Sequence, residues 1–362
     1  MDDAKPSDPA QTLIRSADVK EGPGMSTDHA DARSGQEEIR VSNRATYWPV
    51  SPIDVVVCAP LVARILFGAT PVGRVMQALA IGAYLASALR DWRDRRAIRK
   101  IVFQREFGAD THHLVPMPRE LRETEVRILV ERLNDEFVPQ RIARRELAIA
   151  AELHLTGYIA SISGQRVRTS AEVRGFALVG LAFPFALGAC DVLTGDIAIF
   201  RDTGLFEPHI IAHELSHRKG YWKELHAQAL AYLALAGSGV PVLVQSALVE
   251  RLHRNLCVLS GGDECAFDRL MTRLALRSEV GKSLLALRPS AGRVGQRMEA
   301  AMRGLYERRL RLTGQNGVSD YDLGFTNFLY TFETSTTAQQ VPPSAGAVHR
   351  AGSFRPVETT RL

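Results

Sequence analysis

The chain has 362 residues, of which 46% are apolar and 23% charged, so it is long enough to bury a substantial core and is not disordered throughout. Four cysteines without a C-x-x-C pair exclude a disulfide framework and a zinc knuckle. The net charge of +5 fits nucleic acid or anionic lipid as a partner, but no nucleic-acid-reading motif is present, so we expect no nucleic-acid binding.

The N-terminal part of the chain divides into two regions. Residues 1–45 are rich in Asp, Ala, Ser and Gly and predict a disordered arm. Residues 46–100 predict a hydrophobic helical region with a basic flank. Within it, the stretch 65–89 contains one arginine, Arg74, and exceeds the ~20 residues of a membrane helix. The charged run 90–100 that follows is typical of a cytoplasmic membrane flank.

This pattern predicts membrane association through residues 53–89 and leaves open whether they cross the bilayer once, twice or not at all. Arg64 and Arg74 favour the alternative, a buried helical hairpin of a soluble protein, because an arginine in the middle of a bilayer costs at least ~2.5 kcal/mol.

Downstream, the periodicity of apolar residues predicts mostly helices. Residues 118–155 read as helical with a break at Pro139, whereas residues 175–200 carry glycine, proline and alternating apolar residues that predict strands and turns. Residues 192–200 predict an exposed edge strand. Further helices are predicted at 208–219, 223–236, 240–259, 263–276, 293–313 and 320–332. Residues 334–362 predict a disordered tail.

The segment FEPHIIAHELSHRKGYWKELHAQALAY, residues 206–232, contains the pattern HExxH. A helix that carries His213 and His217 points both imidazoles to one side, at a spacing suited to two ligands of one tetrahedral Zn²⁺. Glu214 lies about 100° away round the helix, so it is a candidate base for a metal-activated water rather than a ligand.

The residues around the motif support a helix of about three turns, with Pro208 in its first turn and Gly220 just past its end. Arg218 and Lys219, directly after the second histidine, are more polar than is usual in the helix of a zinc protease. The alternative interpretation is a surface helix with two unrelated histidines.

The third metal ligand is expected in the next helix. A histidine three residues after Gly220 would define the HExxHxxGxxH subclass, but Lys223 stands there, and zinc repels its ammonium group. Glu224 opens the following helix, and a glutamate from a second helix is the third ligand in the alternative subclass. His226 is a second candidate. Otherwise Glu224 is a first-turn carboxylate favoured by the helix dipole.

The stretch HELSHRKGYWKELHAQALAYLA, residues 213–234, resembles the active-site region of a bacterial family of uncharacterised, membrane-anchored HExxH proteins. It is also similar to the Glu-x-x-Ala-Asp arrangement of the CaaX-type and HtpX-type zinc metalloproteases, in which the leading glutamate ligates zinc. By this resemblance Glu224 is a ligand. The chain departs from the pattern at Gln228, where an aspartate is usual.

Two further stretches, 193–199 and 315–321, fit the uncharacterised family, so the resemblance covers residues 118–333 in patches. Zinc proteases meet the developing oxyanion with the metal and a Tyr or His donor, and Tyr321 in the second stretch is a candidate for that donor. The resemblance implies a membrane anchor. It would place the protein at the bacterial inner membrane with its catalytic domain in the cytoplasm; a soluble cytoplasmic protein is the alternative.

Together these features predict a predominantly helical α+β fold, in which a hydrophobic helical anchor precedes a zincin-like metallopeptidase domain over residues 101–333 with a small sheet. An edge strand near Asp196 would bind an extended peptide or protein substrate. His213, His217 and Glu224 would hold Zn²⁺, and Glu214 would be the base. The alternatives are a non-catalytic metal-stabilised scaffold, a regulatory membrane-associated protein with the same fold, and a helical binding module with a fortuitous motif. The oligomeric state is left open.

Overall fold

The computed structural model describes residues 37–41, 59, 62–139, 142–175, 186–191, 195–288, 304 and 306–335. The predicted tail beyond residue 335 lies outside these residues, as do residues 46–58 of the predicted hydrophobic region and most of the predicted arm. The described part of the arm, residues 37–41, contains the strand β1 (Glu37–Arg40).

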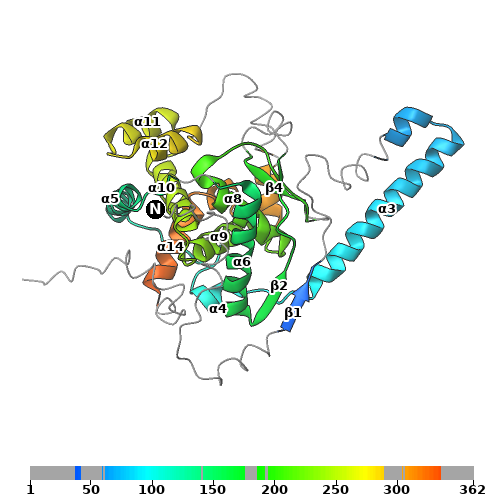
Figure 1. The fold of residues 1–362 in the computed structure, drawn as a ribbon, viewed down its shortest axis with the longest axis horizontal. Helices are drawn as coiled ribbons and strands as arrows, with labels where there is room; N and C mark the ends of the chain where they lie inside the picture. The colour runs from blue at the N-terminus through cyan, green and yellow to red at the C-terminus, as the bar shows by residue number, and fades with distance from the viewer. Residues whose placement is uncertain are drawn as a thin grey trace, which may run out of the picture.

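Helices make up most of the described chain, with small sheets beside them, as predicted (Figure 1). The helices predicted at 208–219, 223–236 and 240–259 correspond to α8 (Glu207–Arg218), α9 (Glu224–Ala236) and α10 (Pro241–Ser260), whereas the sequence did not predict α12 (Ser278–Ala286). Of the helix predicted at 293–313, residues 306–312 are described and are helical. The helices are α3 (Pro71–Arg96), α4 (Phe103–Phe107), α5 (Arg119–Asp135), α6 (Arg144–Ser163), α8 (Glu207–Arg218), α9 (Glu224–Ala236), α10 (Pro241–Ser260), α11 (Glu264–Arg273), α12 (Ser278–Ala286) and α14 (Leu323–Thr334).

Helix α9 lies in the centre of the core. Its sequence, ELHAQALAYLALA, consists mostly of Ala and Leu, which are the best helix formers, and every residue except His226 is buried. A helix that is apolar on nearly all sides must be covered on nearly all sides. Accordingly, α9 packs against α6, α8, α10 and α14. The motif helix α8 is therefore held against a helix that is buried on nearly all sides.

A sharp turn joins α8 to α9. Gly220 has a φ of 87°, in the left-handed region that favours glycine. This conformation reverses the chain so that the Tyr221 N–H donates to the carbonyl of Ser216 at 3.1 Å. The turn brings the beginning of α9 back alongside the end of α8, and the two helices pack against each other.

A small sheet covers one side of α8. Its strands lie in the order β3 (Arg174–Gly175), β5 (Ile197–Ile199), β4 (Gly188–Cys190), with β5 parallel to β3 and antiparallel to β4. The prediction that residues 192–200 form an edge strand is therefore wrong, because β5 is the central strand. All three of its residues are buried, so the strand is not exposed either. The edge strand that packs on α8 is β4.

The strand β2 (Gln165–Arg168) pairs in parallel with β1 and makes a second, two-stranded sheet. Neither strand was predicted. Both are four residues long and carry charged or polar residues at most positions, so they lack the run of apolar residues by which a strand is recognised.

The predicted hydrophobic anchor is wrong. The apolar stretch 65–89 is not one helix: the chain turns at Gly68, where φ is 60°, and α3 begins at Pro71 with the Thr70 hydroxyl as its N-terminal cap. The helix then carries Arg74 near its start and three arginines in its last turn. Within the described ranges, the chain has no helix with the length and apolar character that a membrane crossing requires. Helix α3 extends away from the rest of the molecule (Figure 1).

The two basic residues after the second histidine of the motif are fully buried. The Arg218 guanidinium donates to the backbone carbonyls of Gly195, Ser170 and Glu172 at 2.6–2.9 Å. The Lys219 ammonium donates to the carboxylate of Glu152 at 2.6 Å, and to a hydroxyl and a backbone carbonyl beside it. Through these hydrogen bonds Lys219 connects the end of α8 to α6 and β2. Arg218 connects it to the loops next to β3 and β5.

Candidate metal centre

His213, His217 and Glu224 form a cluster of possible metal ligands. The Nε2 atoms of the two histidines lie 3.1 Å apart, and each lies 3.2 Å from Oε2 of Glu224. The two histidines are one turn apart on α8, and the glutamate is the first residue of α9. The turn at Gly220 is what brings the second helix into reach of the first.

These distances fit a zinc ion. Ligand atoms about 2.0–2.1 Å from the centre of a tetrahedron lie about 3.3 Å from one another. The three separations in the cluster are all within 0.2 Å of that value. Two imidazoles and one carboxylate are also a ligand set that catalytic zinc sites use. The chemistry and the spacing of the three groups therefore suit Zn²⁺.

His217 is oriented by the backbone. Its Nδ1 lies 2.7 Å from the carbonyl oxygen of Tyr221, so Nδ1 carries a proton and donates it, and Nε2 faces the cluster. Burial alone would lower the pKa of His217, but the Glu224 carboxylate outweighs it and raises the pKa to about 9. Without a metal, Nε2 is therefore protonated at neutral pH, and a metal ion must displace that proton to bind.

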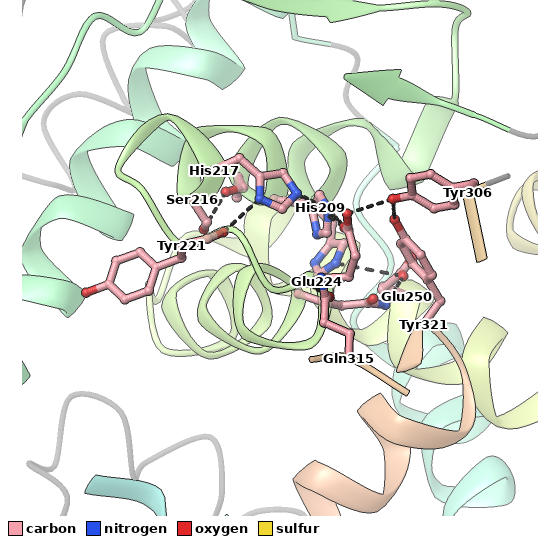
Figure 2. Close-up of polar contacts among 12 residues, drawn as sticks. His209, Ser216, His217, Tyr221, Glu224, Glu250, Tyr306, Gln315 and Tyr321 are labelled. Atoms are coloured by element: carbon pink, nitrogen blue, oxygen red, sulfur yellow. Dashed lines mark hydrogen bonds and ion pairs between the residues drawn. The ribbon is translucent and has the colours of Figure 1, made fainter. Parts of the chain in front are cut away.

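The carboxylate of Glu224 is divided between two sets of partners (Figure 2). Oε2 faces the two imidazoles, whereas Oε1 accepts a hydrogen bond of 2.7 Å from the phenol of Tyr306. Burial alone would raise the pKa of Glu224, but the imidazoles of His217 and His213 hold it well below its usual range. Glu224 is thus ionised, as a metal ligand must be.

Glu214 lies beside the edge strand β4. Its carboxylate accepts a hydrogen bond from the backbone N–H of Cys190, and a side chain at Gly188 would come within 3.2 Å of its Oε1. Burial raises the pKa of Glu214, although both imidazoles and the Cys190 N–H oppose the shift. A carboxyl group whose pKa is raised takes up a proton more readily than an ordinary glutamate.

The other two predicted residues lie in different surroundings. The phenol of Tyr321 is 2.7 Å from that of Tyr306, and its ring lies 6.3 Å from the ring of His213, so it belongs to the site. His226 lies outside the cluster. Its Nε2 is 2.7 Å from Oδ1 of Asp110, and its ring stacks on Phe103 at 3.6 Å.

Gln228 stands where the proteases of the predicted resemblance have an aspartate, and it is not one of the clustered residues. Instead, its Nε2 donates to the carboxylate of Glu250 at 2.8 Å, deep in the core. The same carboxylate accepts a hydrogen bond from Arg254 at 2.6 Å. Burial alone would raise the pKa of Glu250, but the Arg254 guanidinium outweighs it and lowers the pKa to about 2.

This lowered pKa predicts a pH-dependent contribution to stability. Because the pKa of Glu250 falls on folding, its ionised form stabilises the folded protein above the unfolded pKa of about 4.5, and this stabilisation is lost as the pH falls toward 2. We expect Glu250→Gln to be less stable than wild type at pH 7, with the difference shrinking between pH 5 and 3. Urea unfolding across that range measures it; a constant difference would contradict the assignment.

Two residues of the site could not be found from the sequence. Tyr306 lies 82 positions after Glu224 in a helix without any motif. The Gln315 side chain accepts a hydrogen bond of 2.7 Å from the backbone N–H of Glu224. Gln315 belongs to the stretch 315–321, in which only Tyr321 was predicted to have a role. A single sequence offers no spacing rule that pairs such distant residues.

Comparison of the chain with protein-family models, with curated proteins and with solved structures gives no match. The resemblance to membrane-anchored HExxH proteins and to CaaX-type and HtpX-type proteases therefore stays a prediction. The arrangement of His213, His217, Glu224 and Glu214 is therefore the evidence on which a proposed function rests.

Proposed function

We propose that the protein is a zinc-dependent metallopeptidase, which hydrolyses peptide bonds. The observation that carries this proposal is the convergence of three ligand atoms, from His213, His217 and Glu224, at mutual distances of 3.1–3.2 Å. A carboxylate with a raised pKa, that of Glu214, follows the first of these ligands directly in the sequence. This combination of a ligand triad and a neighbouring base is what metal-assisted hydrolysis requires.

Each side chain has a role in the proposed reaction. His213, His217 and Glu224 would hold Zn²⁺, which would act as a Lewis acid and lower the pKa of water to about 7. Glu214 takes a proton from the attacking water and passes it to the leaving nitrogen, so that the C–N bond breaks and a carboxylate and an amine are released. The phenol of Tyr321 is the candidate donor to the oxygen of the scissile carbonyl.

The proposed substrate lies along β4. The β4–β5 ladder continues by one hydrogen bond at each end. The Phe200 N–H donates to the carbonyl of Leu187, and the Asp191 N–H donates to the carbonyl of Asp196. In an antiparallel ladder alternate residues face the partner strand, so the backbone groups of Gly188 and Cys190 face away from β5. An extended peptide could add to this edge through the backbone groups of Gly188 and the carbonyl of Cys190, next to the Glu214 carboxylate, to which the Cys190 N–H already donates.

The number of ligands favours catalysis over the alternative role as a metal-stabilised scaffold. Within the part of the chain that the structure describes, the cluster consists of three residues. Structural zinc sites have four protein ligands, whereas catalytic sites have three and keep one position for water or substrate. The three-residue cluster thus supports a peptidase.

The proposal is tested with the purified protein and a mixture of random-sequence peptides. We expect about one Zn²⁺ per chain, new peptide termini detected by mass spectrometry, loss of cleavage when a chelator removes the metal, and its return when Zn²⁺ is added. Protein with bound zinc that leaves every peptide and an unfolded protein substrate intact would support the scaffold instead. Protein that binds no zinc would exclude both.

A further inference from the structure

Three residues of the segment 306–321, Tyr306, Gln315 and Tyr321, lie around the third ligand of the candidate metal centre (Figure 2). Tyr306 donates to Oε1 of Glu224, Gln315 accepts the backbone N–H of Glu224, and Tyr321 bonds to Tyr306. Three residues of one short segment therefore converge on a single glutamate. Within the described residues, the other partners of that carboxylate are the two imidazoles of His213 and His217.

Helix α9 depends on this segment for its first turn. Lys223 precedes the helix and provides no side-chain cap for its free backbone N–H groups. The Gln315 side chain supplies the missing acceptor, although it lies 91 positions later in the chain. The residue whose backbone it caps is Glu224 itself. The position of the ligand is thus fixed through both its backbone and its carboxylate by residues that follow much later.

Hydrogen bonds within the segment make it a unit. The Glu307 carboxylate accepts the backbone N–H of Val318 at 2.6 Å, and Asn316 donates to Asp320 from both its backbone and its side chain at 3.0 Å. Gly317 has a φ of 98°, in the left-handed region that favours glycine, and the Glu307 carboxylate packs directly against it. The ends of the segment are therefore tied together, so Tyr306, Gln315 and Tyr321 approach or leave Glu224 together.

We propose that metal binding and the docking of residues 306–321 are thermodynamically linked, with Tyr306 as the positioning residue that sets the orientation of the Glu224 carboxylate. The inference rests on the metal centre of the proposed function. The Tyr306 phenol bonds to Oε1 of Glu224, so Oε2 is the oxygen that can bind the metal. The same bond fixes the plane of the carboxylate, so less conformational entropy is lost when the metal binds. Linkage is reciprocal, so the metal stabilises the docked segment as much as the segment stabilises the bound metal.

The first test measures zinc affinity by competition with a coloured chelator. We expect Tyr306→Phe and Gln315→Ala each to weaken binding by about 10–100-fold, the usual effect of losing a partner of a metal ligand. Two matched controls should leave the affinity unchanged. Tyr330→Phe removes a phenol from α14, and Gln245→Ala removes a buried amide that accepts a backbone N–H, that of Val138, at the same 2.7 Å.

A spectroscopic measurement separates positioning from simple destabilisation. With Co²⁺ in place of Zn²⁺, the visible absorption reports the geometry of the ligands. We expect Tyr306→Phe to shift this spectrum, whereas Gln245→Ala should lower the melting temperature and leave the spectrum unchanged. A Tyr306→Phe spectrum identical to that of wild type, together with unchanged zinc affinity, would overturn the positioning role and leave the proposed peptidase standing.

The second test uses the wild-type protein. We expect backbone hydrogen exchange in residues 306–321 to become faster when a chelator removes the metal, while exchange in α10 stays slow. Equal exchange with and without metal would overturn the linkage, even in a protein that binds zinc and cleaves peptides. A wild-type protein that takes up no zinc would overturn the metal centre and the linkage together.

Discussion

Replacing Glu214 by glutamine should lower the rate of peptide hydrolysis by about 10²–10⁴-fold, the usual contribution of a general base, while zinc content stays at about one ion per chain. Glutamine keeps an oxygen that can accept the hydrogen bond from the Cys190 N–H, but it cannot take a proton from water. Because burial disfavours the charged form of Glu214, the variant should fold at least as stably as wild type. Single-turnover peptide cleavage, metal analysis and thermal unfolding measure the three outcomes.

Glu207→Gln provides the matched control on the same helix. Glu207 pairs with Arg144 at 2.5 Å and is not one of the clustered metal ligands. This variant should keep its hydrolytic rate and lose some stability, the reverse of the Glu214 variant. A zinc-loaded Glu214→Gln protein that cleaves peptides at the wild-type rate would show that Glu214 is not the base.

Replacing Lys219 by methionine should have the largest effect on stability, a decrease of about 3–5 kcal/mol in the free energy of unfolding. The ammonium group is fully buried and lies 2.6 Å from Glu152, so its removal leaves a largely buried carboxylate without its positive partner. Urea denaturation measures the loss. Because Lys219 joins the end of α8 to α6 and β2, we also expect these elements to unfold at a lower urea concentration than in wild type.

A double variant identifies the cause of that loss. Glu152→Gln removes the charge that Lys219→Met leaves unpaired, so the double variant should recover part of the stability that the single variant loses. Lys282→Met, on the exposed side of α12, should change the free energy of unfolding by less than about 0.5 kcal/mol. Equal losses for the single and the double variant would show that Lys219 acts through packing rather than through its charge.

The helical part of the fold could be predicted because its signals are local. Helices α8, α9 and α10 begin at or near the predicted residues, since helix-forming residues, Pro208, Pro241 and the glycines that follow mark them within a few positions. The HExxH spacing likewise puts His213 and His217 on one face of a helix. The cluster with Glu224 then follows from a short turn between two adjacent helices.

Most of the other features depend on contacts between distant segments. The break in the stretch 65–89 is the exception, because Gly68 and the Thr70 cap are local signals. The order of β3, β5 and β4 is set by pairing across the sheet, so no pattern in residues 192–200 reveals that they form its centre. The length of the apolar stretch 65–89 suggested an anchor, but Gly68 and the Thr70 cap begin a new helix within it. Tyr306 and Gln315 reach Glu224 only through the folded structure.

The guanidinium of Arg218 has a consequence for the order in which the chain folds. It is bonded to the carbonyls of Ser170, Glu172 and Gly195, all of which leave the ribosome before it does. A nascent chain cannot fasten those peptide groups until residue 218 has been synthesised and α8 has formed beside them. These three carbonyls therefore gain their buried hydrogen-bond donor only after translation has passed the motif, and until then they depend on water.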